Sequence, residues 1–136
     1  MIHEVNISKA KVEQMITNLE SEQIERTTST RDTDKFAQAV CAFSNDMANT
    51  ARNGYLLIGV NDDGSLSGLK ATDDFLQSLG GLRSDGNILP QPIISASSFS
   101  FSGGDVVALE VQPSPFPPVR YKGRTWIRVG PRKAVA

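Results

Sequence analysis

The feature that most constrains the fold is a short apolar strand that runs into a tight turn. Residues 55–60 read Tyr-Leu-Leu-Ile-Gly-Val, with apolar side chains on both faces. Such a strand is expected near the centre of a sheet that is covered on each side. Residues 61–64, Asn-Asp-Asp-Gly, then have the composition of a hairpin turn. Polar groups therefore follow the carboxyl end of a strand, which is where α/β architectures usually bind ligands.

Three helices are predicted from apolar spacing and capping residues. The first begins after Ser8, the second after Asp32 or Thr33, and the third spans residues 72–82 with Thr72 or Asp73 as its cap. Their apolar faces carry Val12, Met15, Ile16 and Leu19 in the first helix, Phe36, Val40, Phe43 and Met47 in the second, and Phe75, Leu76 and Leu79 in the third.

The remaining segments predict short strands. These are residues 22–28, 65–69, 93–101 and 105–112, followed by a hairpin of 119–122 and 124–129 around Gly123. Four prolines in 113–118 predict an extended crossing loop, and residues 131–136 read as the start of a linker. The fold class is therefore α+β: one domain, 1–136, with a mixed sheet of five or six strands and two or three helices packed on it.

Composition is that of an ordinary globular domain. The chain has 136 residues, 39% hydrophobic and 21% charged, which suits one domain with a hydrophobic core. No apolar run approaches the roughly 20 residues of a membrane helix, so no membrane partner is expected. The single cysteine, Cys41, excludes an internal disulfide, is expected to be buried and inert, and suits a reducing cytoplasm.

Charge is distributed unevenly along the chain. No acidic residue follows Glu110, so residues 111–136 carry +6 and the first 110 residues carry −7, which gives the net −1. Such polarity can create a positive face for phosphate groups, or it can be a solvated basic tail.

Four ordered segments carry a family resemblance. They are Glu20-Ser-Glu-Gln-Ile-Glu25, Ala42-Phe-Ser-Asn45, the run 54–64 beginning Gly-Tyr-Leu-Leu-Ile-Gly-Val, and Trp126-Ile-Arg-Val-Gly130. Together they resemble the Schlafen AlbA-like domain, described as DNA-binding, over residues 20–130. The resemblance implies a nucleic-acid-binding module at the N-terminal part of a longer, bacterial transcription-regulator-like protein.

The same resemblance suggests a nuclease centre as an alternative. In Schlafen proteins that cut RNA, the motif positions corresponding to Glu20, Glu25 and Asp62 are catalytic, and such carboxylates would hold Mg²⁺ or Mn²⁺. Against this, a spacing of five puts the two glutamates on opposite faces of a continuous strand, and Asp62 fits ordinary turn chemistry. Arg26-Thr27 and Asn61 also depart from the family pattern. No cofactor is otherwise indicated, and we favour a non-enzymatic role.

The basic segment near the C-terminus is the predicted nucleic-acid surface. Alternation places Arg124, Trp126 and Arg128 on one face of a strand, where arginines beside an indole can bind phosphates and stack a base. Arg120 and Lys122 on the paired strand would extend this surface. The competing interpretation puts Trp126 in the core and uses the arginines to protect a sheet edge.

Three functions thus remain open from the sequence. The first is binding of DNA or RNA through the basic segment, and the second is metal-dependent cleavage of nucleic acid. The third is a domain that senses a nucleotide or other small ligand, or that forms homo-oligomers through a sheet edge.

Overall fold

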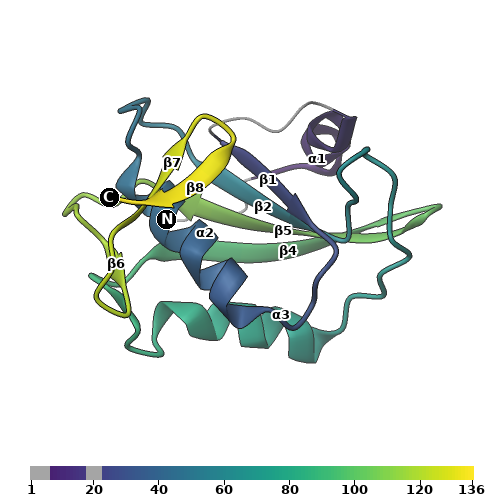
Figure 1. Ribbon diagram of the computed structural model, residues 1–136. Helices are drawn as coiled ribbons and strands as arrows, with labels where there is room; N and C mark the ends of the chain where they lie inside the picture. Colours follow the sequence, from purple (N-terminus) through teal and green to yellow (C-terminus); the bar gives the residue numbers. More distant parts are fainter. Residues whose placement is uncertain (1–6, 18–22) are drawn as a thin grey trace.

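A four-stranded mixed sheet forms the centre of the computed structural model, which describes residues 7–17 and 23–136 (Figure 1). The strand order is β1-β2-β5-β4, where β1 is Ile24–Thr27, β2 is Gly54–Ile58, β4 is Ile93–Phe101 and β5 is Gly104–Gln112. The β1 and β2 strands are parallel, and the other neighbours are antiparallel.

Strand β2 is an inner strand, as its sequence predicts. It pairs with β1 on one side and β5 on the other. Leu56, Leu57 and Ile58 are completely buried. The apolar character of both faces is explained by helices that cover both sides of the sheet.

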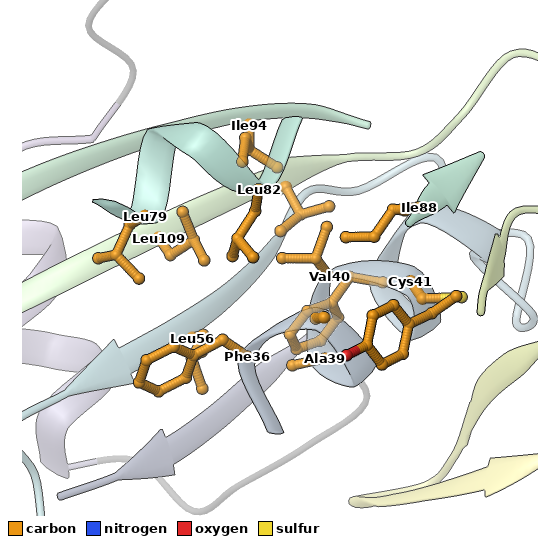
Figure 2. Close-up of a cluster of buried hydrophobic side chains, with 14 of the residues drawn as sticks. Phe36, Ala39, Val40, Cys41, Leu56, Leu79, Leu82, Ile88, Ile94 and Leu109 are labelled. Atoms are coloured by element: carbon orange, nitrogen blue, oxygen red, sulfur yellow. The ribbon is translucent and has the colours of Figure 1, made fainter. Parts of the chain in front are cut away.

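Helices α2 (Thr33–Asn45) and α3 (Asp73–Gly80) cover one face, and α1 (Lys9–Thr17) covers the other (Figure 1). Figure 2 shows the core beneath α2 and α3, where Phe36 of α2 lies beside Leu56 of β2, and Leu79 of α3 lies beside Leu109 of β5. Within residues 7–17 and 23–136, no helix combines the length and the apolarity needed to cross a bilayer.

The predicted caps of two helices are confirmed, but one helix is shorter than its apolar stripe suggested. Asp32 accepts the Lys35 amide at 3.0 Å, and Thr72 accepts the Phe75 amide at 3.1 Å. Helix α2 ends at Asn45 because Asp46 adopts a left-handed conformation, with φ 43°. The prediction that Met47 continues the buried stripe is therefore wrong, and this side chain is 62% exposed. Leu19 lies outside the described residues.

The C-terminal strands pair differently from the predicted hairpin. Strand β6 (Arg120–Tyr121) pairs with β3 (Ile88–Leu89), while β7 (Trp126–Val129) pairs with β8 (Arg132–Val135). Residues around Gly123 form only a bridge between Tyr121 and Arg124. The turn that closes the real hairpin uses Gly130, with φ 62°, so the predicted linker at 131–136 is wrong.

The α+β class is confirmed, with the strands divided among the four-stranded sheet and these two small sheets. A short 3₁₀ helix, Gly81–Arg83, follows α3. Residues 65–69 contribute only a bridge between Leu66 and Val60.

Gly54, the first residue of β2, lies against helix α2. A Cβ atom at this position would stand 2.2 Å from two ring carbons of Phe43. That separation is far below van der Waals contact, so the missing side chain of Gly54 allows the Phe43 ring to lie on the start of β2.

We predict that Gly54→Ala destabilises the fold by about 1–3 kcal/mol through this overlap. Gly80→Ala is the matched control, because a Cβ there meets nothing within 4 Å on a helical backbone, and it should stabilise by about 0.5–1 kcal/mol. Urea denaturation of both variants measures the difference. Equal stability of the two variants would contradict the assigned role of Gly54.

Candidate nucleic-acid interface

Glu25 is a buried member of an ion group rather than an open carboxylate. It lies on β1 and is 7% exposed. Its Oε1 atom is 2.5 Å from the Arg128 Nη1, and its Oε2 atom is 3.1 Å from the Lys133 Nζ. Both carboxylate oxygens are therefore engaged by cations from the hairpin β7–β8.

Arg128 is equally buried, with a side chain only 4% exposed. Its Nη2 donates to the Ile24 carbonyl at 3.2 Å, and its guanidinium carbon lies 4.9 Å from the centre of the Phe43 ring. The arginine thus joins β7 to β1 and α2. The prediction that Arg128 lies on an exposed binding surface is wrong in this geometry.

Of the other two predicted catalytic carboxylates, only Asp62 lies among the described residues, and it does not join Glu25. Glu20 lies outside the described residues. Asp62 is exposed in the turn after β2, and its backbone carbonyl accepts from Arg26 at 3.0 Å. Arg26 and Glu25 are neighbours on β1, so their side chains leave opposite faces of the sheet.

A metal cation that is bound by protein carboxylates needs several of these ligands close together. Across residues 7–17 and 23–136, no three His, Cys, Asp or Glu side chains are grouped to hold a metal ion. The turn itself is structural: Asp63 accepts the amide and hydroxyl of Ser65, and these hydrogen bonds lower the pKa of Asp63.

Cations do reach the surface in β6 and in the turn that leads from it to β7. Arg120, Lys122 and Arg124 are all exposed. Lys122 lies 3.6 Å from Asp34, whose pKa is lowered by a hydrogen bond from Tyr121 and by the charge of Lys122. Within the described ranges, Arg120 and Arg124 form no ion pair. These three residues are called the cationic turn below.

Trp126 is half-buried and packs against the main core, which agrees with the competing interpretation of the basic segment. Trp126 therefore does not lie beside exposed arginines on an open face of β7. Its backbone carbonyl accepts from Asn45 Nδ2 at 2.7 Å.

Asn45 is a positioning residue whose role the sequence did not reveal. Its amide donates to the carbonyls of Val119 and Trp126, and its Oδ1 accepts the Val119 amide at 2.6 Å. One side chain at the end of α2 therefore fixes the backbone on both sides of the cationic turn. The sequence feature that could have indicated this role is the position of Asn45 as the last residue of the Ala-Phe-Ser-Asn segment, 42–45.

A cleft of about 500 Å³ lies on the other face of the sheet, between α1 and the start of β2. Lys11 of α1 and Arg52 of the loop before β2 contribute its cations, and Asn53 and Tyr55 contribute polar atoms. A smaller hollow shares Arg52 and also contacts Arg128, so the two lie at the same end of the sheet.

Comparison with protein families matches residues 20–136 to "Schlafen, AlbA_2". The chain belongs to this family. A solved structure, the DIP2311 protein from Corynebacterium diphtheriae, is similar in fold, with a TM-score of 0.58 and 19% sequence identity. The similarity covers 85% of this chain and 25% of that protein, so this chain spans about a quarter of its length. Among curated proteins, none matches this chain.

Membership of the Schlafen AlbA_2 family gives the signature residues a physical meaning here. Glu25 and Arg128 pair, Phe43 lies against both Arg128 and Gly54, and Asn45 holds the strand that carries Arg128. In the described part of this domain, these motif positions join β1, α2, β2 and β7.

We predict that Glu25→Gln destabilises the fold by about 3–5 kcal/mol, because it removes the buried negative charge that pairs with Arg128 and Lys133. Chemical denaturation provides the measurement. Glu13→Gln, which removes an exposed carboxylate on α1, is the control and should stay within about 0.5 kcal/mol of the parent. An unchanged stability of the Glu25 variant, together with loss of a nuclease activity, would instead assign Glu25 to catalysis.

Proposed function

We propose that this Schlafen AlbA_2 domain binds nucleic acid through the cationic turn and acts as a DNA- or RNA-binding module of a transcription-regulator-like protein. The single observation that carries the proposal is the exposure of Arg120, Lys122 and Arg124 on a backbone that Asn45 fixes from both sides. Family membership supports the same class of function.

The proposed interface contacts phosphates rather than bases. Guanidinium groups pair with phosphate oxygens in a fixed fork geometry, and such contacts position a strand without reading its sequence. Arg128 contributes indirectly, because its ion pair with Glu25 holds β7 in place behind the turn. Trp126 contributes its half-buried ring to the support of that turn.

A metal-dependent nuclease using Glu20, Glu25 and Asp62 is not favoured by any observation in the described residues. Glu25 would have to leave Arg128 and Lys133 before it could hold Mg²⁺ or Mn²⁺. Removing one partner of a buried ion pair is strongly unfavourable. The binding proposal requires no such rearrangement.

We predict that the domain binds a fluorescent oligonucleotide in anisotropy measurements, with affinity that falls as salt rises. About three phosphate contacts correspond to a slope of log K against log salt of roughly −2 to −3. Arg124→Ala should weaken binding at every sequence tested and reduce the magnitude of the slope by about one.

Arg83→Ala is the matched control, since Arg83 is an exposed arginine on the separate 3₁₀ helix and should bind like the parent. Absence of binding by the parent at low salt would reject the proposed function. Equal losses in the Arg83 and Arg124 variants would reject the cationic turn as its site.

A further inference from the structure

The cleft beside α1 has a fixed polar floor. Glu110 lies beneath it on β5 and is only 4% exposed. Its Oε2 atom accepts from Asn53 Nδ2 and from the Tyr55 hydroxyl, each at 2.9 Å. Burial and the neighbouring carboxylate raise the pKa of Tyr55 to about 12, as expected for a phenol that donates to a buried carboxylate.

Glu110 thereby orients two side chains that line the cleft. Asn53 uses one amide N–H on Glu110 and its amide also donates toward the Tyr55 hydroxyl, which leaves its carbonyl oxygen for a ligand. An amide oxygen can accept a hydrogen bond from the exocyclic amino group of a base such as adenine. The buried carboxylate explains why this amide is held in one orientation.

The cations of the cleft come from two elements on either side of this floor. Lys11 and Arg52 are exposed, line the cleft, and form no ion pair within residues 7–17 and 23–136. The loop that carries Arg52 is ordered by Asp46, whose carboxylate accepts the amides of Thr50 and Ala51 at 3.0 and 2.9 Å. These hydrogen bonds therefore hold the backbone next to Arg52 in place.

Apolar groups complete the cleft. Met15 of α1 and Ile24 of β1 line it together with Tyr55. A volume of about 500 Å³ is within the range of small-molecule sites. Cations for a phosphate, an amide for a base edge and apolar walls for a planar ring are the groups that one nucleotide requires.

We propose that this cleft binds one nucleoside 5′-monophosphate unit, with its phosphate at Lys11 and Arg52 and its base edge at Asn53. The unit can be a free nucleotide or an unpaired nucleotide of a bound strand. The strand form rests on the proposed function and deepens it, because Arg52 also lines the hollow that contacts Arg128 of β7, the strand that follows the cationic turn.

Calorimetric titration of the full chain tests the pocket itself. Adenosine 5′-monophosphate should bind at least about tenfold tighter than ribose 5-phosphate or inorganic phosphate, since only the first offers a base to Asn53. Arg52→Ala should weaken its binding by about tenfold, as expected for one charged hydrogen bond. Arg83→Ala and Arg124→Ala should leave it unchanged. Binding of phosphate as tight as that of the nucleotide, or no effect of Arg52→Ala, would overturn the proposal.

Anisotropy with a single strand and with its blunt duplex separates the two sources of the nucleotide. If the cleft takes an unpaired nucleotide, the single strand binds at least fivefold tighter and Arg52→Ala removes that preference, while Arg124→Ala weakens both. Oligonucleotide binding that depends on Arg124 but not on Arg52, without mononucleotide binding, overturns this inference and leaves the proposed function standing. Mononucleotide binding without oligonucleotide binding supports the cleft and rejects the proposed function.

Discussion

The ion group of Glu25, Arg128 and Lys133 is the interaction on which the arrangement of this domain depends. It joins an edge strand of the sheet to a hairpin 103 residues later in the sequence. Its members are buried or half-buried, so the opposite charges compensate one another away from water. A two-stranded hairpin is at best marginally stable alone, and β7–β8 exposes Val129 and Val135. The ion group and the Asn45 hydrogen bonds therefore hold this hairpin against the sheet.

Part of the C-terminal excess charge of +6 is used in ion pairs within the fold. Arg128 and Lys133 are used in the ion group with Glu25, and Lys122 lies near Asp34. The charge left for a polyanion is consequently smaller than the sequence total and is concentrated at a few exposed arginines. A modest salt dependence, rather than the steep one of a protein with many phosphate contacts, follows from that count.

Local chemistry made much of the fold predictable from the sequence. Asp32 and Thr72 act as caps, Gly64 closes the turn after β2 with φ 89°, and the doubly apolar segment forms an inner strand. Pairing among the last strands was not predictable, because β6 finds β3 and β7 finds β8 through contacts that no local pattern specifies. Gly130 was the available signal for the hairpin that does form.

Site residues were harder to predict for the same reason. Alternation correctly places Trp126 and Arg128 on one face, yet it cannot say that this face turns inward toward Glu25 and Phe43. The cleft is also non-local, since Glu110 meets Asn53 and Tyr55 only when β5 pairs with β2. The sequence feature that could have indicated the cleft is Glu110, a glutamate within a largely apolar strand.

The most direct test of the central claim is the coupling free energy between Glu25 and Arg128 in a double-mutant cycle. The cycle compares Glu25→Gln, Arg128→Gln and the double variant with the parent by chemical denaturation. A buried structural pair predicts a favourable coupling of about 2–3 kcal/mol. A coupling below about 0.5 kcal/mol, as for an exposed pair, would contradict the account.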